Sequence, residues 1–154
     1  MRKVSQLSAK EVEEIRGLVG KEFTPYRVEV EKGVIRRLAE AIGDQNPLWQ
    51  DQDSEKSPGK EIMAPPALCL SMMMYGFIPG VTVLLNRGLD AAHSWKFHAP
   101  IRAGDVLTVR SKIVDSYERQ GKKFGVMVFL VFETLLSNQQ GEKVCTHRGT
   151  MLWY

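Results

Sequence analysis

The sequence predicts one α+β domain in which an antiparallel β-sheet wraps around a long buried central helix. Two patterns indicate this architecture. Residues 67–77 are apolar nearly all round, so a helix over this range has no face suited to water. Four long segments rich in β-branched and aromatic residues follow it, with short turns between them, and short turns between long strands require antiparallel pairing. The chain has 154 residues, about one domain, and we expect residues 1–154 to form it.

The N-terminal part of the chain predicts a capped helix followed by a short strand. Ser8 and Glu11 form a capping-box pattern ahead of apolar residues at helical spacing, and Gly20 is expected to end this helix. Between residues 26 and 30, apolar and charged residues alternate, which is typical of a half-buried strand.

A second helix is predicted over residues 34–42, where apolar residues recur with a helical period. Arg36 and Glu40 are spaced for an i,i+4 ion pair on its polar side. Gly43 is a natural C-terminal stop, and the polar stretch 44–60 is predicted to be a loop.

The remainder of the chain predicts the central helix and the sheet. Pro65 and Pro66 suit the start of a helix, because the first amides of a helix have no intrahelical partner. The expected strands cover residues 93–99, 106–117, 125–136 and 142–154, with turns at 103–105, 120–123 and 138–141.

Composition narrows the classes of function. The net charge of +3 is spread along the chain, whereas nucleic-acid binders concentrate Lys and Arg on one surface. The longest apolar region, residues 64–83, is interrupted by glycine, proline and serine and is a poor membrane span. Cys69 and Cys145 lack CxxC spacing and are expected to be buried free thiols rather than a disulfide, as in a cytoplasmic protein.

The segment 43–49, Gly-Asp-Gln-Asn-Pro-Leu-Trp, resembles the Gly-Asp-x-Asn-Pro-(Leu/Ile/Val)-His signature of MaoC-like R-specific enoyl-CoA hydratases at every position but the last. Where that family places a histidine, this chain has Trp49. Further landmarks are Met-Ala-Pro-Pro at 63–66 and the stretch 95–105. Over about residues 26–151, the chain looks most like the N-terminal hot-dog half of the type I fatty-acid-synthase dehydratase branch. The resemblance implies a single hot-dog fold.

The resemblance also implies a chemistry. In the family, the motif aspartate and histidine position one water against the enoyl double bond, which needs two titratable groups. Asp44 and Asn46 are therefore the candidate catalytic residues, although both residue types are also ordinary turn formers after a helix. Trp49 cannot move the proton, because its indole N–H only donates. No metal or cofactor is implied. The expected substrate-binding residues are Trp49, Ala64, Pro65, Pro66 and His98.

A single chain without the motif histidine resembles the supporting subunits of this family, which shape the acyl tunnel beside a catalytic hot dog. The expected substrate is an acyl-CoA or acyl-carrier thioester, and the expected assembly is a homodimer or a heterodimer with a second hot-dog subunit. Three alternatives stay open: a self-sufficient hydratase in which His93 or His98 replaces the motif histidine, a non-catalytic acyl-CoA-binding protein, and a thioesterase with Asp44 as base. The Gly-Asp-x-Asn-Pro segment argues against the last.

Other conspicuous residues have plainer interpretations. His93, His98 and His147 are interpreted as ordinary hydrogen-bonded strand histidines, and the methionines at 72–74 as core packing. The cations at Arg119, Lys122 and Lys123 are interpreted as solvated hairpin charges, with a contact to nucleotide phosphates as the alternative.

Overall fold

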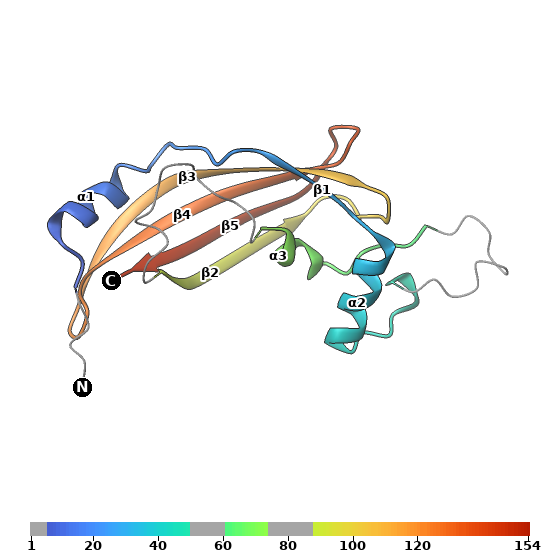
Figure 1. Cartoon of the computed structure of the whole chain (residues 1–154), viewed down its shortest axis with the longest axis horizontal. Coiled ribbons are helices and arrows are strands. Elements are labelled where there is room, and N and C mark those ends of the chain that lie inside the picture. Colours follow the sequence, from blue (N-terminus) through green and yellow to red (C-terminus); the bar gives the residue numbers. More distant parts are fainter. Residues whose placement is uncertain (1–5, 50–60, 74–87) are drawn as a thin grey trace.

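The computed structural model describes residues 6–49, 61–73 and 88–154, which form a five-stranded antiparallel sheet with three helices (Figure 1). The helices are α1 (Ala9–Arg16), α2 (Lys32–Ile42) and α3 (Leu68–Met73), with a 3₁₀ turn η1 (Pro47–Trp49) after α2. The strands are β1 (Tyr26–Glu29), β2 (Gly88–Phe97), β3 (Val106–Gly121), β4 (Gly125–Ser137) and β5 (Lys143–Trp153). The predicted antiparallel sheet is confirmed.

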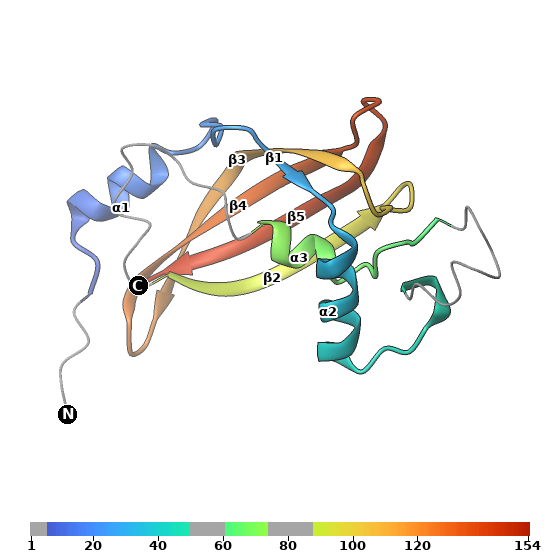
Figure 2. The ribbon, with the colours of Figure 1, turned by 45° about the vertical axis from the view of Figure 1, so that its right-hand side comes forward.

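The strands lie in the order β1-β3-β4-β5-β2, and every neighbouring pair is antiparallel. β2 therefore forms one edge of the sheet and pairs with β5, a strand more than 40 positions later in the chain. The two views in Figures 1 and 2 place α1 at one end of the sheet and α2 at the other.

The two faces of the sheet differ in character. Val109, Leu136, Cys145 and Phe97 are successive cross-strand partners and so share one face, which we call the helix face because α3 packs on it. Their neighbours point the other way, because side chains alternate along a strand. We call that opposite side the outer face; it carries Arg110, Leu135, Thr146 and Lys96.

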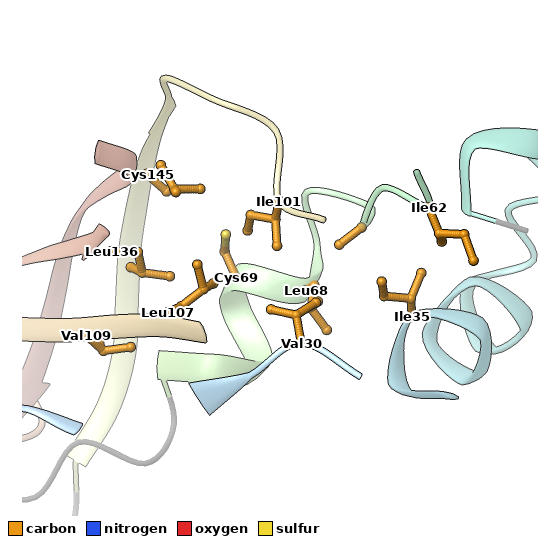
Figure 3. Packing of buried hydrophobic residues seen from close by; sticks show 12 residues of the cluster. Val30, Ile35, Ile62, Leu68, Cys69, Ile101, Leu107, Val109, Leu136 and Cys145 are labelled. Carbon is orange, nitrogen blue, oxygen red and sulfur yellow. The ribbon is translucent and has the colours of Figure 1, made fainter. Parts of the chain in front are cut away.

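α3 contributes two fully buried residues to the main core. Leu68 and Cys69 are 1% and 0% exposed and lie among Val30, Ile101 and Leu107 (Figure 3). The expectation of a helix buried on all sides is wrong for the single chain, because Leu70 is 50% exposed. The rest of the predicted helix, residues 74–77, and the side chains of the methionines at 72–74 lie outside the described part of the structure.

α1 covers a second core at the far end of the helix face. Ile15 and Leu18 pack against Ile113 and Leu130 there. The capping box is present, with the Glu11 amide donating to Ser8 Oγ at 3.2 Å. The predicted stop at Gly20 is wrong: the helix ends at Arg16. The Gly20 amide instead donates to the Ile113 carbonyl at 2.8 Å, because this segment runs along the edge of β3.

Other predictions hold with shifted ends. α2 ends at Gly43, which has a positive φ of 69°, and Arg36 and Glu40 lie 3.8 Å apart on its exposed side. β2 begins at Gly88 rather than at residue 93, because pairing with β5 continues to Trp153.

Cys69 and Cys145 are free and buried, as expected, and the neighbouring Cys145 thiol together with burial raises the pKa of Cys69.

Candidate functional site

The signature segment begins where α2 stops. Gly43 adopts a left-handed conformation, which a residue without a Cβ accepts at little cost. The Asp44 amide then donates to the Ala39 carbonyl at 2.9 Å and closes the helix end. This geometry turns the Asp44 side chain back toward the residues that follow it.

Both oxygens of the Asp44 carboxylate accept hydrogen bonds from within the segment. The amide of Asn46 donates to Oδ1 at 3.0 Å, and the indole Nε1–H of Trp49 donates to Oδ2 at 2.8 Å. The Asn46 side chain in turn accepts from the Leu48 amide at 3.0 Å. Asp44 and Asn46 thus act as turn formers, and Asp44 has an indole where the family motif would supply an imidazole.

The hydrogen bonds of the other candidate bases lie elsewhere. His98 Nε2 contacts Thr146 Oγ1 at 3.0 Å, and His93 contacts residues on β2 and β5. In the described part of the chain, neither histidine shares a hydrogen bond with Asp44. The structure therefore does not favour a hydratase in which His93 or His98 replaces the motif histidine.

Four of the five predicted substrate-binding residues line one hollow of about 320 Å³. Trp49, Ala64, Pro66 and His98 form its wall together with the segment 97–101. Backbone hydrogen bonds hold the wall in place, from the Met63 amide to the Leu48 carbonyl at 3.0 Å and from the Ala64 amide to the Ile101 carbonyl at 2.8 Å.

Pro65, the fifth predicted substrate-binding residue, is not on this wall. It is buried, and its carbonyl accepts from the Leu68 amide at 2.9 Å in the turn that opens α3. The amides of Cys69 and Leu70 likewise donate to the carbonyls of Pro66 and Ala67, respectively. In this chain the first amides of α3 are therefore already engaged within the turn.

A second polar cluster lies on the helix face of the sheet and joins Asp90, His93 and His147. His93 Nε2 lies 2.7 Å from Asp90 Oδ2, and His93 Nδ1 lies 2.8 Å from His147 Nε2. The Trp95 ring packs against His147 with centroids 4.3 Å apart. His93 and His147 are hydrogen-bonded strand histidines, as expected, but the sequence does not show that they contact each other, because that contact depends on β2 pairing with β5.

Burial determines the charge state of His147. It is 4% exposed, and its Nδ1 atom has no hydrogen-bond partner among the described residues. Burial, followed by the charge of His93, lowers the pKa of His147 to about 4, so this ring is neutral at neutral pH. Gly149 makes room for it: a Cβ there would lie 2.5 Å from His147 Cε1.

Two structural findings bear on other classes of function. Among the described residues, no group of three or more His, Cys, Asp or Glu side chains is arranged to hold a metal ion. Nor does any helix in the described ranges have the length and apolar character needed to cross a membrane.

Comparisons with known proteins agree with this fold. Residues 17–147 match the family model "FAS1-like, dehydratase domain region". A UPF0336 protein of Saccharopolyspora erythraea is 32% identical over 146 residues, covering 89% of each chain. A probable enoyl-CoA hydratase alpha subunit of Thermomonospora curvata is 25% identical over 137 residues, which are 77% of this chain and 43% of that protein.

The solved structures show the same fold. The HadBC (3R-hydroxyacyl-ACP dehydratase) complex of Mycobacterium tuberculosis superposes with a TM-score of 0.69 at 22% identity, covering 88% of this chain and 96% of that one. The R-hydratase PhaJ1 of Pseudomonas aeruginosa gives a TM-score of 0.66 at 20% identity, covering 86% of this chain and 79% of that one. The chain is thus an α+β hot-dog protein that belongs to the FAS1-like dehydratase-region family.

Proposed function

We propose that this protein is a supporting subunit of an R-specific enoyl-thioester hydratase or 3-hydroxyacyl dehydratase and that a second hot-dog subunit supplies the catalytic pair. The observation that carries the proposal is the hydrogen bond from Trp49 Nε1 to Asp44 Oδ2 at 2.8 Å. The indole N–H donates to the carboxylate at the place where an active site would need a second titratable group. The segment keeps the shape of the motif without its acid-base pair.

The reaction would take place in the shared tunnel. In the hydration direction, the oxygen of one water forms a bond to C3 of the enoyl thioester while a base takes one of its protons. The C2=C3 π bond breaks toward C2, and a proton is delivered to C2, which gives the 3-hydroxyacyl thioester. Dehydration is the reverse. In this proposal the partner's aspartate and histidine handle the water and the proton, since Asp44 is held by Asn46 and Trp49.

This chain's contribution is the tunnel wall. The hollow of about 320 Å³ is lined by Trp49, Ala64, Pro66 and His98 and is mostly apolar. Its size lies at the lower end of the range for small-molecule sites, about 300–1,000 Å³. A hollow of this kind suits the acyl end of a thioester and leaves the reacting atoms to the partner.

Surfaces left open in the single chain support the need for a partner. β2 is an edge strand, and Leu89 and Phe97 on it are 51% and 46% exposed. Leu70 on α3 is 50% exposed. Proteins seldom leave a long strand edge and large apolar side chains uncovered together. The HadBC and ChsH1–ChsH2 structures, which share the fold, are both complexes, and this proposal extends such pairing to the present chain.

Reconstitution tests the proposal. The chain is purified alone and together with a hot dog that carries the intact Gly-Asp-x-Asn-Pro-x-His motif, and hydration of crotonyl-CoA is followed by the loss of enoyl absorbance. We expect little turnover by the chain alone and clear turnover by the complex. Alanine in place of the partner's aspartate should cost on the order of 10²–10⁴ in rate. Asp44→Ala should cost far less.

The matched control is Asp115→Ala, which removes an exposed carboxylate on β3. Its effect should be negligible in both preparations. Robust turnover by the chain alone, abolished by His93→Ala or His98→Ala, would contradict the supporting role and would assign the chemistry to a histidine of this chain.

A further inference from the structure

The outer face of the sheet carries a second, larger hollow, of about 580 Å³. Its floor follows cross-strand partners: Lys96 on β2 lies opposite Thr146, which lies opposite Leu135, which lies opposite Arg110 on β3. Three inter-strand spacings separate the two cations, or ~14 Å. We call this hollow the outer trough.

The outer trough is lined by more positive than negative side chains. The cations on its wall are Lys96, Arg110, Lys112, Lys143 and Arg148, and the carboxylates are Glu22 and Glu133. Glu133 pairs with Arg148. In the described part of the chain, the other four cations have no ion-pair partner.

Unpaired like charges on one sheet face repel each other, and an anion bound between them would relieve that repulsion. Phosphate groups match Lys and Arg well, because charge-assisted hydrogen bonds to phosphate are short and strong. Leu135 gives the floor an apolar centre, and the Thr146 hydroxyl adds a polar group there. The lining therefore suits a ligand with both phosphates and a less polar body.

The size of the outer trough favours a small molecule over a protein. Its volume of about 580 Å³ lies within the range of ligand pockets. Stable protein partners instead cover about 800 Å² per side of broader surface. An acidic carrier protein is the weaker match.

The outer trough and the acyl hollow are neighbours. His98 lines the acyl hollow, and its Nε2 lies 3.0 Å from the hydroxyl of Thr146 on the floor of the trough. Lys96 of the trough is likewise separated from His98 by Phe97 alone, which lines the acyl hollow. A ligand with an acyl end and a phosphate-bearing end could therefore use both hollows.

We propose that the outer trough binds the 3′-phosphoadenosine 5′-diphosphate end of a coenzyme A thioester whose acyl end lies in the neighbouring hollow. The choice of coenzyme A rests on the proposed function. Lys96, Arg110 and Lys112 contact the phosphates, and this places the nucleotide site on the sheet rather than on the β3–β4 hairpin that carries Arg119, Lys122 and Lys123.

Binding of adenosine 3′,5′-bisphosphate to the full chain, measured by calorimetry at low and high salt, tests the site without any turnover. The trough variant is Lys96→Gln with Arg110→Gln and Lys112→Gln. The matched control is Arg119→Gln with Lys122→Gln and Lys123→Gln, which also removes one arginine and two lysines, all exposed. We expect the trough variant to bind about tenfold more weakly or worse, and the control to bind like the unmodified chain.

Three results would overturn the proposal. These are no binding by the unmodified chain, equal losses in the two triple variants, and binding of an acidic carrier protein at the trough in place of the nucleotide. Thermal melting of both variants checks that they are folded. Because the assay needs no catalytic partner, a failure here leaves the reconstitution test of the supporting role unaffected.

Discussion

The signature segment, residues 43–49, and the cluster of Asp90, His93 and His147 differ in how they bring polar side chains into contact. The first is local: hydrogen bonds link Asp44, Asn46 and Trp49 within six consecutive positions. The second is tertiary: His93 and His147 meet across 54 positions, because β2 pairs with β5. A motif visible in the sequence holds no acid-base pair, whereas titratable groups meet where the sequence shows no motif.

The segment 43–49 differs from the family signature at a single residue, Trp49, so Trp49→His should give the largest effect. The substitution would place an imidazole beside the Asp44 carboxylate, where the indole now donates. We expect the purified chain to gain crotonyl-CoA hydration by on the order of 10²-fold or more.

The control for this gain is Trp49→His combined with Asp44→Ala, which should return activity to the original level. An unchanged rate in Trp49→His would mean that the missing histidine is not what separates this chain from an active hydratase, and the comparison between motif and function would fail at that point.

The tertiary cluster should make stability depend on pH. His147 has a pKa of about 4 in the folded chain against 6.5 for the ordinary side chain, so the unfolded state binds more protons between these values. The stability that comes from keeping His147 neutral is fully present above pH 6.5 and is lost as pH falls toward 4. The free energy of unfolding should drop by about 3 kcal/mol from this group alone.

Denaturant unfolding at a series of pH values measures this drop. The His147→Gln variant lacks the titrating ring and should show a shallower decline over the same interval. Parallel profiles for the unmodified chain and His147→Gln would show that His147 is not held neutral by the fold.

Gly149→Ala tests how tightly the tertiary cluster is packed. The new Cβ would lie 2.5 Å from His147 Cε1 and 3.4 Å from His93 Nδ1, so the rings or the strand must move. We expect a loss of about 2 kcal/mol in the free energy of unfolding, measured by thermal or denaturant melting.

Gly33→Ala is the control for adding a methyl group. It lies in the first turn of α2, where a Cβ would meet Arg37 Nη1 at 3.5 Å, an ordinary contact. Its effect should be small or stabilising, by about 0.4–1 kcal/mol. Equal effects of the two alanines would mean that the cluster can relax around an extra methyl group.

The smallest effect should come from breaking the local hydrogen bond itself. Trp49→Phe keeps an aromatic side chain, with a smaller ring, and removes the donor to Asp44 in a partly exposed setting. We expect a loss of about 1 kcal/mol in the free energy of unfolding. In an Asp44→Ala background the same substitution should add little, and a double-mutant cycle measures the difference. Additive losses would show that the two side chains do not interact.

The local features of this fold could be read from the sequence because neighbours along the chain decide them. Ser8 and Glu11 cap α1, and Gly43 ends α2 with a positive φ. The turns at 138–141 and 103–105 separate strands where the glycines allow a left-handed backbone. In each case the conformation depends on side chains within a few positions.

The features that the sequence analysis missed depend on distant partners. Gly20 does not end α1, because its amide bonds to β3. β2 begins earlier than its residue pattern indicates, because β5 continues to pair with it. None of these bonds can be assigned before the strands are placed.

The sequence by itself determined the hot-dog class, the order of helix and strands, and the absence of the motif histidine at Trp49. Only the tertiary structure decided that the Trp49 indole bonds to Asp44, that His93 and His147 share a hydrogen bond, and that Lys96 and Arg110 belong to one trough. The physical reason is the distance along the chain over which each kind of interaction acts. Periodicity and turn chemistry act over a few residues, whereas sheet register brings together side chains from strands far apart in the chain, and register follows from the whole core.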